Sequence, residues 1–267
     1  MANDSPASEF ADLFELKGRA AYIPGGYGAI GEAIAWGLAQ RGARVAVSGR
    51  DAGKAEKLAA EIRAAGFDAL GVAMDAHSVD SIRESTDRVA KHYGGLDILV
   101  NCVGIQREEL LLDVTEEAFD EVYQVNLKSA MFLAQAAAKY QIAGKRGGKQ
   151  VHLLSVRSHF AVRARGYSAY CSTKGALVLL VRQHAMELAP HGITVNGVAP
   201  TVVNSEMGTK NWQRDPKGWQ ALLDRIPLGR VADPKDVVGP TLMFCAPASD
   251  FITGQVLYID GGITSSQ

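Results

Sequence analysis

The sequence has few of the features that mark disulfide-rich, metal-binding, membrane or nucleic-acid-binding proteins. Its three cysteines, Cys102, Cys171 and Cys245, lie far apart and form no Cys-x-x-Cys pair. We therefore expect neither a disulfide framework nor a metal site, and a reducing, cytoplasmic location. No stretch approaches the roughly 18 apolar residues of a membrane span. The net charge is -1 with no long Lys/Arg run, which predicts no nucleic-acid or membrane partner.

The remaining composition, 47% hydrophobic and 21% charged over 267 residues, is that of a globular domain. Short apolar runs alternate with segments of helical period, the pattern of βαβ units. The sequence predicts an α/β fold: one Rossmann-type doubly wound domain with a seven-stranded parallel sheet and helices on both faces. We expect a flexible N-terminal arm over 1–15, the domain over 16–267, and a substrate lid over about 204–228. The expected strands are 19–23, 43–48, 69–74, 96–101, 150–155, 193–199 and 255–259.

A glycine-rich turn follows the first apolar run. Gly26-Tyr-Gly28-Ala-Ile-Gly31 fits Gly-x-Gly-x-x-Gly, with a predicted strand before it and a predicted helix after it. In that setting the glycines let backbone N–H groups approach a pyrophosphate, which the start of the helix also attracts. The alternative is a tight strand-to-helix turn that binds nothing.

A second cluster carries proton chemistry. Tyr170 and Lys174 are four residues apart in a helical pattern, so they share one face. An ammonium about 4 Å from a phenol at an effective dielectric of about 20 favours the phenolate by about 4 kcal/mol, or about three pKa units. Ser155, at the end of the fifth predicted strand, could hold a substrate oxygen, and Asn126 interrupts an apolar helix. A surface Tyr-Lys pair without function is the alternative.

Together these residues resemble the short-chain dehydrogenases/reductases, over nearly the whole chain. Tyr170-x-x-x-Lys174, Ser155 and Asn126 resemble the catalytic residues of that family, "NCVG" at 101–104 resembles its Asn-Asn/Ser-Ala-Gly segment, and "VLYIDGG" at 256–262 its last strand. The resemblance implies an NAD(P)-dependent oxidoreductase and a homotetramer. The cofactor contacts that it implies are Gly25, Tyr27, Gly28, Ala29, Ile30, Gly31, Arg50, Asp75, Ala76, Asn101, Val103, Gly104, Tyr170, Lys174, Pro200, Val203 and Ser205.

The sequence departs from the family pattern at three places. Pro24 and Ala29 replace the usual threonine and second glycine of the glycine turn, and Thr201 replaces the glycine after Pro200. Ser155 lies fifteen residues before Tyr170 and Ser158 twelve, on either side of the usual spacing. We choose Ser155 because it closes an apolar run.

The second predicted strand indicates which nucleotide binds. An acid at its end would bind the 2'-hydroxyl of NAD, whereas an arginine accepts the 2'-phosphate of NADP. Gly49 stands in the place of the acid and Arg50 follows, so NADP is favoured over NAD, although Asp51 could reach back.

Arginines near the catalytic tyrosine suggest a small polar substrate. Arg157, Arg107 and Tyr167 are the expected substrate contacts, and a sugar acid or polyol is the expected substrate type. The segment Gly104-Ile-Gln-Arg107 also resembles gluconate 5-dehydrogenase-like members of the family. A 3-oxoacyl thioester reductase and a non-catalytic nucleotide-binding regulator are the alternatives.

Overall fold

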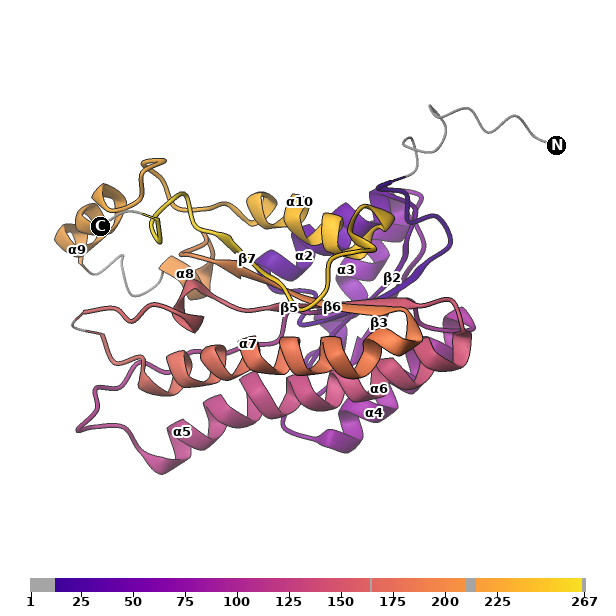
Figure 1. Cartoon of the computed structure of the whole chain (residues 1–267), viewed down its shortest axis with the longest axis horizontal. Helices are drawn as coiled ribbons and strands as arrows, with labels where there is room; N and C mark the ends of the chain where they lie inside the picture. The colour runs from indigo at the N-terminus through magenta and orange to yellow at the C-terminus, as the bar shows by residue number, and fades with distance from the viewer. Residues whose placement is uncertain (1–12, 164, 210–214, 266–267) are drawn as a thin grey trace.

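The computed structural model describes residues 13–163, 165–209 and 215–265. Its core is a seven-stranded, wholly parallel sheet in the order β3-β2-β1-β4-β5-β6-β7 (Figure 1). Each strand overlaps one of the predicted apolar runs, so the predicted fold is confirmed. The strands are β1 (Ala20–Pro24), β2 (Arg44–Gly49), β3 (Ala69–Ala73), β4 (Ile98–Asn101), β5 (Gly148–Leu153), β6 (Ile193–Pro200) and β7 (Val256–Ile259).

Helices cover both faces of the sheet (Figure 1). One face packs against α2 (Ala29–Gln40), α3 (Ala52–Ala64) and α10 (Pro234–Cys245). The other packs against α4 (Val79–Tyr93), α6 (Ser129–Gly144) and α7 (Ser168–Leu188), with α5 (Glu116–Tyr123) joined to α6 through the π-helical turn η1 (Gln124–Lys128). Because the central strands are buried on both sides, they are nearly continuous apolar runs. The 3-10 turns are η2 (Val156–Ser158), η3 (Ala189–His191) and η4 (Pro247–Ser249).

N-cap side chains and glycines mark the ends of several of these helices. Asp51, Ser78 and Thr115 each accept a backbone N–H at the start of α3, α4 and α5. Gly66 and Gly94 follow α3 and α4 with φ of 92° and 72°, a backbone conformation that favours glycine. Both helices are therefore followed by a glycine in the left-handed region.

The two segments predicted outside the core are only partly described. Residues 1–12 of the predicted arm lie outside the described residues. Leu13 accepts a hydrogen bond from the Ala248 N–H at 2.9 Å, and Leu16 donates to the Arg41 carbonyl at 2.9 Å, so the chain contacts the domain from residue 13 onward. The predicted lid contains α8 (Glu206–Thr209) and α9 (Pro216–Asp224). Residues 210–214, including Trp212, lie outside the described residues.

The strand order places a topological switch point between β1 and β4, because the chain crosses from β3 past β2 and β1 to reach β4. The turns after these two strands touch: a Cβ on Gly25 would lie 2.8 Å from the Cys102 carbonyl carbon. Ligands of open α/β sheets bind at this edge. Every helix in the described residues is too short or too polar to cross a membrane.

Candidate active site

A cavity of about 580 Å³ opens at the carboxyl edge of the sheet, at the switch point. Its walls come from the segments that follow β1, β4, β5 and β6, together with α7, α8 and the start of α3. Most of the residues predicted from the sequence line it. They are Gly25, Tyr27, Gly28, Ala29, Ile30, Gly31, Val103, Gly104, Ser155, Arg157, Tyr167, Tyr170, Lys174, Pro200, Val203 and Ser205.

The glycine turn brings the start of α2 to this cavity. Gly25 has a φ of 76°, and a Cβ on Gly31 would lie 2.4 Å from the Gly25 carbonyl oxygen, so both positions need glycine. Gly28 is the N-cap of α2, where no side chain accepts the first N–H groups, in contrast to α3, α4 and α5. An uncapped helix start at a cavity wall fits the diphosphate of a dinucleotide. Ala29 lines the cavity as the first residue of α2.

Tyr170 and Ser155 meet at the opposite wall. β5 ends at Leu153, two residues earlier than predicted, and Ser155 is the N-cap of η2, where its Oγ accepts the Arg157 N–H at 3.2 Å. The Tyr170 hydroxyl is hydrogen-bonded to the Ser155 side chain. Ser158 does not line the cavity, and its buried hydroxyl has no partner among the described residues. The structure therefore pairs Tyr170 with Ser155 and not with Ser158.

Lys174 lies beside this pair without lowering the pKa of the phenol. Its Nζ donates to the Leu153 carbonyl at 2.7 Å and lies 5.7 Å from the centre of the Tyr170 ring. Burial of the hydroxyl raises the pKa of Tyr170 to about 12, and the Ser155 hydrogen bond opposes that rise. Burial also lowers the pKa of Lys174 to about 8. The predicted shift of the Tyr170 pKa towards neutrality is thus wrong for this structure, because burial raises that pKa and Lys174 is not among the groups that lower it.

Asn126 joins the loop after β4 to α7. It lies in η1, and its Oδ1 accepts the Ile105 N–H at 2.8 Å while its Nδ2 donates to the Ile105 carbonyl at 3.0 Å and to the Thr173 Oγ1 at 3.3 Å. A Cβ on Gly104 would lie 3.5 Å from the Lys174 Nζ and 3.6 Å from the Asn126 Oδ1. Asn126 and Lys174 therefore both lie against Gly104, although Asn126 does not line the cavity.

Four residues predicted to contact the cofactor do not line the cavity: Arg50, Asp75, Ala76 and Asn101. The Asn101 Oδ1 accepts the Val103 N–H at 3.0 Å, which fixes the turn after β4. The Asp75 Oδ1 accepts the His77 N–H at 3.0 Å. Arg50 is exposed just after β2.

Two of the three predicted substrate residues line the cavity. Arg157 lines the cavity, and its Nη1 donates to the carbonyls of Phe160 and Ala161 at 3.2 and 3.0 Å. Tyr167 also lines it, and the centre of its ring lies 6.2 Å from the centre of the Tyr170 ring. Arg107 does not: it pairs with Glu121 at 2.6 Å.

Sequence reasoning missed several residues of the cavity wall. Lys54 lines it from the first turn of α3, which begins at Ala52. Gln106 lines the wall after β4, and Glu206 and Met207 come from α8. No motif marks these three residues.

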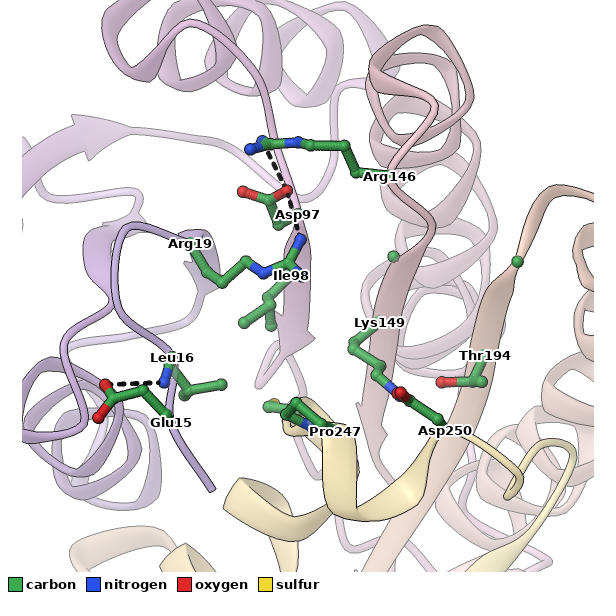
Figure 2. Close-up of a pocket in the computed structure, with 13 residues that line it drawn as sticks. Glu15, Leu16, Arg19, Asp97, Ile98, Arg146, Lys149, Thr194, Pro247 and Asp250 are labelled. Carbon is green, nitrogen blue, oxygen red and sulfur yellow. Dashed lines mark hydrogen bonds and ion pairs between the residues drawn. The ribbon is translucent and has the colours of Figure 1, made fainter. Parts of the chain in front are cut away.

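A second cavity, of about 320 Å³, lies at the amino edge of the sheet (Figure 2). The nearly buried carboxylate of Asp97 accepts from Arg146 at 2.7 Å and from Arg19 at 3.4 Å, and Lys149 pairs with Asp250 at 2.7 Å. None of the predicted site residues lines it. The cavity at the carboxyl edge is therefore the candidate active site.

Comparisons with known proteins agree with this geometry. A family model described as "Enoyl-(Acyl carrier protein) reductase" matches residues 26–264. The gluconate 5-dehydrogenase of Gluconobacter oxydans (strain 621H) is 34% identical over 255 residues, which cover 96% of this chain and 98% of that protein. The L-xylulose reductase of Mesocricetus auratus is 37% identical over 242 residues, 85% of this chain and 97% of that protein.

A solved structure has the same fold. The crystal structure of a gluconate 5-dehydrogenase from Burkholderia cenocepacia J2315 in complex with NADP and tartrate matches with a TM-score of 0.92 and 34% identity, covering 96% of this chain and 99% of that one. With the Tyr170, Ser155 and Lys174 arrangement in place, these matches identify the chain as a member of the short-chain dehydrogenase/reductase family of NAD(P)-dependent oxidoreductases.

Proposed function

We propose that the protein transfers a hydride between a nicotinamide cofactor and a carbonyl or secondary alcohol of a small sugar acid or polyol. The observation that carries this proposal is the hydroxyl pair of Tyr170 and Ser155 beside buried Lys174, in the same cavity as the uncapped start of α2. The cavity therefore joins a site for a dinucleotide to a site for proton transfer.

Each residue has one role in the proposed reaction. The bound nicotinamide supplies or accepts the hydride. Tyr170 gives its proton to the substrate oxygen during reduction and takes it back during oxidation. One hydride and one proton together convert the carbonyl to the alcohol, and their removal restores the carbonyl. Ser155 holds that oxygen by a hydrogen bond. Lys174, fixed by the Leu153 carbonyl, provides positive charge beside the phenol, and Asn126 fixes the loop at Gly104 against the lysine.

The substrate class rests on Arg157 and on the relatives. Arg157 places a cation in the cavity wall near the hydroxyls of Tyr170 and Ser155. Burial lowers its pKa from the ordinary value of an arginine, which favours an anionic group beside it. Relatives named for gluconate and xylulose, and the tartrate in the name of the solved structure, support a polyhydroxylated or carboxylate-bearing substrate. Tyr167 completes this wall.

NADP is the proposed cofactor. Gly49 leaves β2 without the acid that would bind a 2'-hydroxyl, Arg50 follows it, and the name of the solved relative includes NADP. We also propose contacts from Asp75, Ala76 and Asn101 at the adenosine end of the cofactor.

Two further proposals concern assembly and location. Exposed apolar side chains on α5 and α7, namely Phe119, Tyr123, Leu179 and Met186, support association of these helices between copies, in a homotetramer. The three separate thiols support a cytoplasmic location.

A 3-oxoacyl thioester reductase is the second candidate, because the description of the matched family model refers to acyl carrier protein. The deciding experiment is a cofactor fluorescence titration followed by turnover assays with sugar acids, polyols, keto-acids and acetoacetyl thioesters under both nucleotides. Turnover of sugar acids or polyols supports the proposal, and preference for the thioester supports the second candidate. Nucleotide binding without turnover across the whole panel would support a non-catalytic regulator.

A further inference from the structure

The ring of Tyr27 occupies the space above Gly49, at the end of β2. A Cβ on Gly49 would lie 2.4 Å from the Tyr27 Cε1 and 2.6 Å from both Cζ and Oη. No side chain fits at Gly49 while the ring keeps this place. An acid that binds the 2'-hydroxyl of NAD would stand at position 49. This position is occupied by a glycine, and the Tyr27 ring fills the space that a side chain there would need.

Two contacts hold the ring there. The Tyr27 Oη accepts the Asp51 N–H at 3.1 Å, and the ring packs against the apolar cluster under α2 and α3. Asp51, the nearest acid in the chain, uses its Oδ1 to accept the Lys54 N–H at 3.0 Å as the N-cap of α3. This carboxylate therefore stabilises the helix start and does not face the cavity as a substitute for the missing acid.

Lys54 brings a positive charge to the same part of the cavity. It lines the wall together with Tyr27 and Gly28. Two other cations line the cavity, Arg157 and Lys174, and both belong to the segments that carry Ser155 and Tyr170. Among the described residues, Lys54 is thus the lining cation on the segment after β2, three residues after Asp51, whose N–H donates to the Tyr27 Oη. The acid at this end of the wall is Glu32, in the first turn of α2.

We propose that Tyr27 and Lys54 determine cofactor specificity, an inference that rests on the proposed NADP preference. Tyr27 excludes an acidic side chain from position 49. Lys54 binds the 2'-phosphate, with Arg50 outside the cavity wall as a second cation. A phosphate and an ammonium form a charge-assisted hydrogen bond, which is among the stronger polar contacts in proteins.

The first test measures equilibrium binding, using adenosine 2',5'-bisphosphate and 5'-AMP as probes in titration calorimetry. Lys54→Gln should weaken the bisphosphate about tenfold or more and leave 5'-AMP unchanged. Lys57→Gln is the matched control, because Lys57 is on the same helix, does not line the cavity and has a side chain that is 79% exposed. It should change neither affinity.

The outcomes distinguish a failure of this inference from a failure of the proposed NADP preference. If the unaltered protein binds both probes equally, the NADP preference itself fails. If it prefers the bisphosphate and Lys54→Gln behaves like Lys57→Gln, or weakens both probes alike, the role of Lys54 is overturned while the NADP preference stands.

The second test concerns Tyr27. Gly49→Asp alone should lower the thermal unfolding temperature and weaken both probes, because its Cβ overlaps the ring. The double variant Tyr27→Ser with Gly49→Asp should recover the unfolding temperature and bind 5'-AMP in preference to the bisphosphate. If Gly49→Asp alone is as stable as the unaltered protein and already prefers 5'-AMP, Tyr27 does not close the position.

Discussion

Ser155 and Ser158 offer a sharp test of the proposed site, because they lie close in sequence but have different surroundings. The Ser155 side chain lines the cavity and is hydrogen-bonded to Tyr170, so Ser155→Ala removes both a contact of the proton donor and a donor to the substrate oxygen. Loss of one preorganised hydrogen bond to a reacting oxygen typically costs about 100- to 1000-fold in kcat. We expect a loss of that size, with nucleotide affinity unchanged.

Ser158→Ala, in contrast, should not reduce turnover. Its hydroxyl is buried without a partner among the described residues, and an unpartnered buried polar group costs about 1–3 kcal/mol. Removing it should leave kcat unchanged and keep or raise the free energy of unfolding. The assays are steady-state kinetics with a substrate found in the panel, nucleotide titration and urea unfolding. A loss of turnover in Ser158→Ala as large as that in Ser155→Ala would refute the assignment.

Three more predictions follow from Arg157, His152 and Tyr170. Arg157→Ala should reduce kcat/KM for an anionic substrate more than about tenfold, or about 1.4 kcal/mol, beyond its effect on a neutral analogue; equal losses would mean that Arg157 only anchors the carbonyls of Phe160 and Ala161. Burial lowers the pKa of His152 to about 3, so the unfolded chain binds a proton that the folded chain does not, and stability falls as pH drops below about 6.5. The unfolded histidine is half protonated at pH 6.5, so the integrated loss between pH 6.5 and 5 is about 1.6 kcal/mol. Urea unfolding at both pH values should show a smaller loss of stability in His152→Gln, whereas exposed His159→Gln should lose as much as the unaltered protein. Because the pKa of Tyr170 is raised to about 12, the phenol keeps its proton at neutral pH. The rate of reduction should therefore be independent of pH between about 6 and 8, and the rate of oxidation should rise with pH. A reduction rate that falls through neutral pH would contradict this.

The fold follows closely from the sequence because its signals are local. Apolar runs bounded by turns gave all seven strands, and Gly66 and Gly94 ended helices where glycine is needed for a positive φ. The choice of Ser155 also depended on a local feature, the end of the apolar run that became β5.

The parts that sequence reasoning missed depend on tertiary contacts. The pKa of Tyr170 is governed by burial of its hydroxyl, which helical spacing does not reveal. Arg107 pairs with Glu121 on α5, fourteen residues away, instead of lining the cavity. The overlap between Tyr27 and Gly49 joins two different strand ends, so neither position alone indicates it.

The central claim is that Tyr170 is the proton donor of a hydride transfer in this cavity. Its most direct test compares Tyr170→Phe with the unaltered protein, measuring NADPH affinity by fluorescence titration and NADPH consumption with the substrate found in the panel. The ring is retained and only the hydroxyl is lost, so the account predicts nearly unchanged NADPH affinity and almost no turnover. Turnover above a few per cent of the original, with the cofactor bound normally, would contradict it.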